Sequence, residues 1–100
     1  CMNIVTEAEG VGAAVLLRSI MPKYGIDLMQ ANRATDNLKR LSVGPGNLTK
    51  SLGINIEDNL KVLNRSDIFI YDEGISLDYK ATKRIGISRS VDLLLRFVAV

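Results

Sequence analysis

Two short runs near the start of the chain favour β-structure. Residues 2–6 and 13–19 are β-compatible. Gly10 and Gly12 lie between them and supply the backbone freedom of a hairpin loop. The pattern therefore predicts a β-hairpin at the start of the chain.

The second run contains a cation among apolar residues. Arg18 falls on the same face of the predicted strand as Leu16 and on the opposite face from Leu17, because strand side chains alternate. Two interpretations are open. The arginine can extend to water from an edge strand, or it can have an acidic partner.

The next segment contains the proline and capping residues that are typical of short helices. After Pro22, residues 26–33 have an imperfect helical spacing of apolar positions. A second short helix through residues 38–41 is expected, with Thr35 or Asp36 as its N-cap, because an oxygen side chain accepts from first-turn amides.

The stretch LSVGPGNLTKSLGI, residues 41–54, predicts a helix from about residue 46 to residue 52. Leu48 and Leu52 are four residues apart and would face one core, and Gly53 is placed for a left-handed cap. At the entrance, Pro45 disfavours the α region for the residue before it. The first-turn amides would favour a phosphate oxygen, although a simple turn explains the same residues.

The second half of the chain predicts one helical turn and three strands. The turn is expected at residues 59–63 and a buried strand at 67–71, with further strands at 84–88 and 93–100. Gly86 inside a strand indicates close approach of another backbone or a ligand. The fold class expected is α+β with a mainly antiparallel sheet.

Composition indicates one domain and leaves the partner open. The chain has 100 residues, 47% of them hydrophobic, and a formal net charge of +2. The bases cluster in two regions, and they form either one basic face or separate solvated charges. The clusters are Lys39, Arg40 and Lys50, and then Lys80, Lys83, Arg84, Arg89 and Arg96.

Several classes of protein are disfavoured by what the sequence contains. A single cysteine, Cys1, cannot build a disulfide framework, and with no histidine a transition-metal site is not expected. No apolar run approaches the roughly 20 residues that cross a bilayer, so no membrane partner is expected, and a reduced intracellular compartment is favoured. Because the chain starts at Cys1 and stops in an apolar run, we expect a fragment.

Five blocks, in order and with similar spacing, resemble the alkyladenine (3-methyladenine) DNA glycosylases. The resemblance covers nearly all of residues 1–100. The blocks are Cys1-Met2-Asn3, Val15-Leu16-Leu17-Arg18, Gly44-Pro45-Gly46 with Leu48, Thr49, Leu52, Gly53 and Ile54, Arg84-Ile85-Gly86-Ile87, and Leu95-Arg96-Phe97.

The resemblance implies a monomeric base-excision enzyme that needs no cofactor. Its partner is double-stranded DNA containing a damaged purine, which it flips out before hydrolysing the N-glycosidic bond with water. The fold implied is α+β, a curved, mainly antiparallel sheet with short helices, similar to the C-terminal domain of formyltransferases. Residues 1–100 would form the C-terminal part of a single glycosylase domain. The location implied is cytoplasmic and nucleoid-associated in a prokaryote, or nuclear in a eukaryote.

Four residues match the family's catalytic and base-binding positions. Arg18 and the backbone carbonyl of Ile85 match the groups that hold the water together with a glutamate. Asn3 matches the asparagine that leaves no room for the 2-amino group of guanine, although without the resemblance its amide could equally pair with nearby backbone. Leu16 would form an apolar wall of the same pocket.

Six residues match the region that lies against the DNA backbone, where contacts position the duplex without reading sequence. The resemblance implies that many relatives carry lysine at the position of Asn47, so this chain lacks a cation there. Lys50, one turn later, would replace that cation only in part. The six are Gly44, Pro45, Gly46, Asn47, Lys50 and Gly86.

The family's general-base glutamate, stacking side chains and wedge tyrosine match no position here, so residues 1–100 alone are expected to be inactive. One alternative is a non-catalytic nucleic-acid-binding barrel. Against it, the chain has five aromatic residues, which are expected mostly in core-like strands rather than on stacking platforms. The other alternative is a small structural or regulatory domain.

Overall fold

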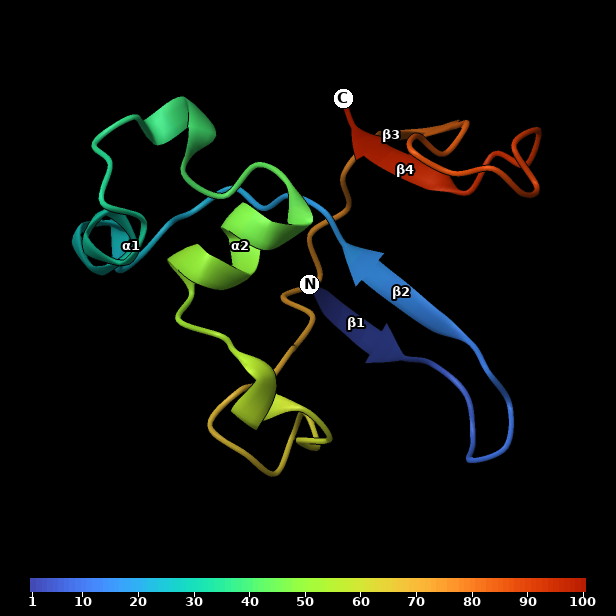
Figure 1. Ribbon diagram of the computed structural model, residues 1–100, viewed down its shortest axis with the longest axis horizontal. Coiled ribbons are helices and arrows are strands. Elements are labelled where there is room, and N and C mark those ends of the chain that lie inside the picture. The colour runs from blue at the N-terminus through green and yellow to red at the C-terminus, as the bar shows by residue number, and fades with distance from the viewer. The chain divides into compact units, whose positions relative to one another are not determined.

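The computed structural model describes residues 1–100, which divide into two units, Cys1–Val62 and Leu63–Val100. Each unit is described by itself (Figure 1). The first unit contains strands β1 (Met2–Val5) and β2 (Ala14–Leu17), helices α1 (Ile26–Arg33) and α2 (Pro45–Ser51), and 3₁₀ turns at Leu38–Arg40 and Ile56–Asp58. The second contains strands β3 (Tyr79–Thr82) and β4 (Arg96–Ala99).

Strands β1 and β2 form the predicted hairpin. They pair antiparallel, and beyond them the Thr6 N–H donates to the Ala13 carbonyl at 3.2 Å. In the loop, Gly10 has φ 91°, a left-handed conformation that glycine adopts without steric cost. The hairpin prediction is confirmed.

Helix α1 spans the predicted residues, whereas the second predicted helix is a single 3₁₀ turn. The side chain of Asn37 caps that turn by accepting from the Lys39 N–H at 3.2 Å. The predicted caps were wrong: the Thr35 hydroxyl accepts instead from the Asn37 N–H at 3.2 Å. Thr35 therefore closes the turn that precedes the cap.

Helix α2 begins and ends as its sequence predicted, within one residue. Gly44 precedes it at φ 96° and Pro45 is its first residue. After its end, Gly53 has φ 68°, and its N–H donates to the Lys50 carbonyl at 3.2 Å.

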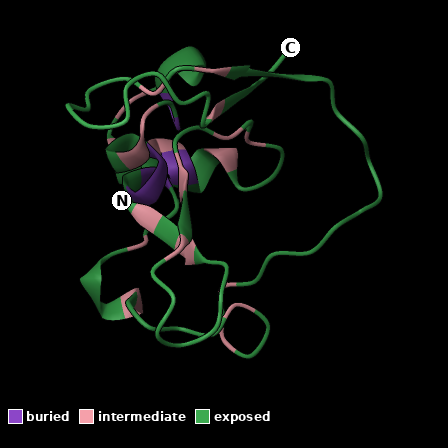
Figure 2. Cartoon of the chain, turned by 90° about the vertical axis from the view of Figure 1, so that its right-hand side faces the viewer, coloured by how far each residue is buried: buried purple, intermediate pink, exposed green.

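The core of the first unit lies between α1 and α2 and is small. Its buried apolar side chains are Met29, Leu41 and Leu48, and Figure 2 shows most of the remaining chain exposed. The two helices are also joined by the Asn32 side chain, which donates to the Ser51 carbonyl at 3.0 Å. Leu52 was expected in this core but is 44% exposed. It follows the last helical residue, where the chain turns away.

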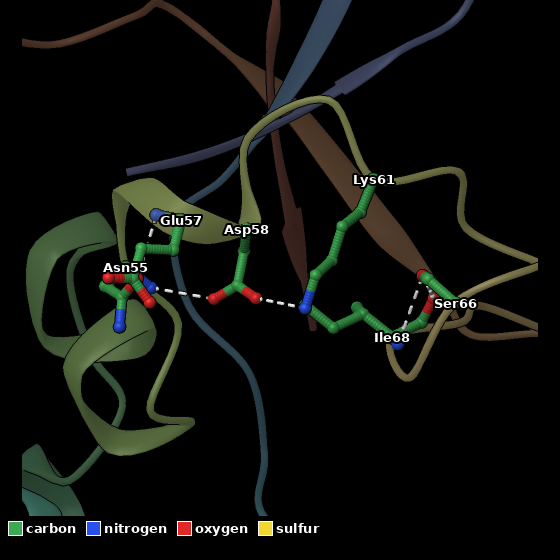
Figure 3. A network of polar contacts seen from close by, with 6 residues as sticks. All are labelled: Asn55, Glu57, Asp58, Lys61, Ser66 and Ile68. Atoms are coloured by element: carbon green, nitrogen blue, oxygen red, sulfur yellow. Dashed lines mark hydrogen bonds and ion pairs between the residues drawn. The ribbon is translucent and has the colours of Figure 1, made fainter.

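The helical turn expected at residues 59–63 lies three residues earlier, at Ile56–Asp58. Asn55 and Asp58 form a capping box that fixes its start, with the Asn55 N–H donating to the Asp58 carboxylate at 2.9 Å (Figure 3). Leu60 has φ 68°, which is incompatible with a right-handed helix.

In the second unit, two of the three predicted strands were wrong. Residues 67–71 form no strand. The Ser66 hydroxyl donates to the Ile68 carbonyl at 3.0 Å and accepts from its N–H at 3.3 Å, a local turn that competes with strand pairing. Residues 84–88 also form no strand, and Gly86 there has φ 69°.

The sheet of the second unit is a hairpin of which the sequence predicted only one side. Strand β4 covers four residues of the predicted 93–100, and its antiparallel partner is β3, which was not predicted. The Thr82 hydroxyl donates to the Arg96 carbonyl at 3.1 Å and accepts from its guanidinium at 3.2 Å. Both sheets are two-stranded, and the single curved sheet of the formyltransferase type stays a prediction.

None of the helices has the length and apolar character of a membrane span.

Candidate functional site

Two residues predicted to line a base pocket face each other across the first hairpin. Asn3 on β1 pairs directly with Leu16 on β2. Opposed residues in an antiparallel pair share a face, with Cβ atoms about 5 Å apart. Asn3 is exposed and Leu16 is half-buried. The structure thus brings the predicted selectivity residue and the predicted apolar wall together.

Arg18 lies one residue beyond the end of β2, on the same face by strand alternation. It is exposed. Its side chain makes no hydrogen bond or ion pair within the first unit, whereas Arg33 donates to the Arg40 carbonyl at 3.3 Å. An exposed guanidinium without a partner can be solvated, or it can donate to a carboxylate from outside these residues.

The end of β2 is joined to the loop that enters α2. Ser19 and Val43 form an isolated antiparallel bridge, so the residues that flank it, Arg18 and Gly44, are opposed in the same register. The Ser42 hydroxyl also donates to the Ile20 carbonyl at 2.9 Å. The Arg18 end of the hairpin and the Gly-Pro-Gly segment are therefore neighbours. The resemblance implied that this segment lies beside the damaged base, but the Ser19–Val43 pairing was not predicted because no local pattern reveals the pairing of distant residues.

The entrance of α2 leaves backbone donors available. No side chain caps the helix at Gly44, and a Cβ added to Gly46 would meet nothing within 4 Å. The N–H groups of Gly46 and Asn47 have no intrahelical acceptor at this position. The Asn47 side chain donates to the Val43 carbonyl at 2.9 Å, so its amide closes the loop.

Lys50 was expected near the entrance of α2, but the helix is only seven residues long and Lys50 lies near its end. It lies in the last turn of α2, where a cation favours the helix dipole, and it is exposed. It follows Asn47 by three residues and so shares its face of the helix. Helical side chains lean toward the N-terminus, which directs Lys50 back toward the Gly-Pro-Gly segment.

Ile85 and Gly86 lie in the loop between β3 and β4 of the second unit. Ile85 is 56% exposed. At Gly86 an added Cβ would meet nothing within 4 Å of this chain, and the positive φ of 69° favours glycine there; the close approach of a ligand at this position stays a prediction. Because Ile85 and Arg18 belong to different units, their meeting at one water stays a prediction.

Several bases of the second cluster have structural partners. Arg84 donates to the carbonyls of Arg89 and Ser90 at 3.2 and 3.4 Å, which holds the loop that contains Ile85. The Lys83 amine lies 3.7 Å from the Asp92 carboxylate. These cations stabilise the hairpin loop, a role that charge counting could not reveal.

Asp58 is a carboxyl with a perturbed pKa, and it lies outside the predicted site. A hydrogen bond from the Lys61 amine at 2.5 Å lowers its pKa. The Asn55 N–H, which also donates to this carboxylate, lowers the pKa further (Figure 3). A lowered pKa makes a weaker base, so Asp58 has the chemistry of a structural cap.

Comparison with known proteins gives one consistent result. Residues 1–100 match the family described as Methylpurine-DNA glycosylase (MPG). A protein of Prosthecochloris aestuarii named "Putative 3-methyladenine DNA glycosylase" is 42% identical over 98 residues, 95% of this chain and 47% of the relative. Proteins of the same name from Methanoculleus marisnigri and Francisella tularensis are 40% and 38% identical, each over 97% of this chain and 53% of the relative. The chain spans about half the length of these relatives, and no solved structure matches it.

Proposed function

Residues 1–100 belong to the methylpurine-DNA glycosylase family, and from this premise we propose that they supply part of an enzyme that excises damaged purines from double-stranded DNA. The relatives bear the name of a 3-methyladenine DNA glycosylase. The proposed reaction is hydrolysis of the N-glycosidic bond by water, without a cofactor, in a monomer.

One observation supports the proposal most directly. Asn3, Leu16 and Arg18 lie on one face of the first hairpin, and the adjoining bridge sets this face beside the entrance of α2. The first unit's contributions to base selection, water placement and backbone contact would then lie on adjoining surfaces.

The chemistry demanded is modest, which suits these residue types. Alkylation leaves a purine cationic and a better leaving group, and flipping costs a few kcal/mol, least for a damaged base. Arg18 can donate to the attacking water and to a carboxylate that lies outside residues 1–100. That carboxylate stays ionised beside the guanidinium. The Ile85 carbonyl would accept from the same water.

The DNA backbone would rest on the Gly-Pro-Gly segment. The free amides of Gly46 and Asn47 suit phosphate oxygens, which position a duplex without reading its sequence. Lys50 would add a cation on the same face, and Gly86 would contribute an amide from the second unit.

Arg18 provides the decisive test. In a chimera, residues 1–100 replace the matching half of the Prosthecochloris aestuarii relative, and excision of 3-methyladenine from duplex DNA is followed in single-turnover experiments. Arg18→Ala should slow excision about 100-fold, as loss of one aimed donor does, with duplex affinity changed only a few-fold. Arg40→Ala, another exposed arginine of the unit, is the control and should retain the parent rate. Full excision by Arg18→Ala would exclude water placement, and an inactive parent chimera would contradict the proposed reaction.

Asn3 tests the pocket separately. Asn3→Ala should admit guanine-type lesions because space opens for the 2-amino group, and Val5→Ala, the next position of β1 on the same face, should not. Unchanged base preference in Asn3→Ala would remove the steric role.

A second candidate, single-strand binding without catalysis, is favoured by one finding. The expectation that the aromatic residues lie mostly in core-like strands was wrong. Phe69 and Tyr71 are 61% and 68% exposed, with stacked rings 5.7 Å apart. Such a pair can stack on bases. If this is the function, Phe69→Leu should weaken binding of a single-stranded oligonucleotide while the chimera excises no base.

A further inference from the structure

Ser42 has a buried hydroxyl that joins two distant segments. It is 2% exposed. Its hydroxyl donates to the Ile20 carbonyl at 2.9 Å, and its own carbonyl accepts from the Ile20 N–H at 3.4 Å. The two residues are 22 positions apart, so these bonds stabilise tertiary structure and not a local turn.

Resting on the function proposed above, we propose that Ser42 is a positioning residue that aligns the water-holding arginine with the DNA-backbone segment. We call the two hydrogen bonds between Ser42 and Ile20 the Ser42 clamp. The Ser19–Val43 bridge lies immediately beside it. One residue before the bridge is Arg18, and one residue after it is Gly44. The bonds of Ser42 therefore fix Arg18 relative to Gly44, and their loss would move the end of β2 while α2 keeps its own backbone donors.

The Ser42 hydroxyl makes the shorter of the two hydrogen bonds in the clamp. The backbone bond between the same segments is long, at 3.4 Å, and the bridge is isolated rather than part of a ladder. Removal of the hydroxyl would leave the part-buried Ile20 carbonyl without its short hydrogen bond, which costs free energy where water cannot replace the donor. The end of β2 would then relax, and a misplacement near 1 Å can cost as much as about 100-fold in rate.

A role in stability alone must be separated from positioning, and Ser51 makes that separation possible. Ser51 is equally buried, at 1% exposed, and its hydroxyl donates at 2.8 Å. Its acceptor, however, is the Leu48 carbonyl inside the same helix. Ser51→Ala removes a buried serine hydroxyl of matched bond length without releasing β2.

The experiment compares Ser42→Ala, Ser42→Cys and Ser51→Ala in the chimera. Ser42→Ala should lower the single-turnover excision rate about tenfold with duplex affinity within about twofold, since the amides of α2 remain. Ser42→Cys, similar in shape but a weak donor, should fall between Ser42→Ala and the parent. Ser51→Ala should keep the parent rate. Amide exchange at Ile20 should accelerate in Ser42→Ala and not in Ser51→Ala.

Equal rates for Ser42→Ala and Ser51→Ala, or unchanged exchange at Ile20, would overturn the positioning role. An inactive parent chimera would instead overturn the proposed function and the catalytic part of this inference. Exchange at Ile20 would still decide whether the clamp exists.

Discussion

The two units of the chain hold their strands by different means. Residues 1–62 bury apolar side chains between two helices and fasten the hairpin to α2 through the Ser19–Val43 bridge. Residues 63–100 contain no buried position, and their hairpin relies on backbone pairing and the Thr82–Arg96 bonds. An isolated two-stranded hairpin is marginal in water. The first unit can therefore present a prearranged face, whereas the second presents a loop.

The largest expected effect is in the core of the first unit. Leu48→Ala should lower the free energy of unfolding by about 3 kcal/mol, because it removes a fully buried side chain and leaves a cavity. Leu52→Ala, 44% exposed in the same segment, should cost less than about 1 kcal/mol. Urea unfolding followed by circular dichroism measures both. Equal losses would contradict the core described here.

A smaller effect should be confined to the second unit. Thr82→Val keeps the side-chain shape and removes both hydrogen bonds to Arg96, at a cost of about 1 kcal/mol. Amide exchange should accelerate in β3 and β4 and stay unchanged in α1 and α2. Faster exchange throughout the chain would show that the two units do not open independently.

The third effect concerns DNA. Lys50→Gln should reduce the slope of log affinity against log salt by about one unit in the chimera, similarly for all duplex sequences. Lys23→Gln, a lysine that precedes α1, should leave the slope unchanged. Equal slopes for Lys50→Gln and the parent would remove Lys50 from the interface.

The smallest effect is a pH dependence at Asp58. Its pKa is lower in the folded chain than its ordinary value of 3.8, chiefly because Lys61 donates to it. Its stabilising contribution is therefore present above pH 3.8 and is lost as pH falls through the lower folded pKa. Asp58→Asn should flatten the loss of stability below that pH. An unchanged acid profile in the variant would contradict the role of this carboxylate.

Local signals explain why the first unit was predictable. Glycine at positive φ, proline at the first helical residue and alternation in the hairpin each act within a few residues, and so the hairpin, α1 and α2 were predicted. The Ser19–Val43 bridge and the burial of Leu41 depend on tertiary contacts that no local pattern encodes.

The second unit shows the opposite case. An apolar run such as residues 67–71 forms a strand only if a partner strand is available. Here the Ser66 side chain instead forms a local turn with the backbone of Ile68. The loop of residues 84–88 is shaped by the Arg84 guanidinium and by Gly86. Of the candidate site, Asn3, Leu16 and Arg18 were expected together, and the hairpin register and strand alternation put them on one face.

The central proposal is that the Arg18 guanidinium would hold the attacking water beside Asn3, with the Ile85 carbonyl as the second partner that the family resemblance implies. A crystal structure of the chimera bound to duplex DNA with an uncleavable damaged purine measures it most directly. The account predicts one ordered water within about 2.6–3.2 Å of both the Arg18 guanidinium and the Ile85 oxygen, with Asn3 against the flipped base. An Arg18 guanidinium that holds no water near the flipped base, or a water that the Ile85 oxygen does not contact, would contradict it.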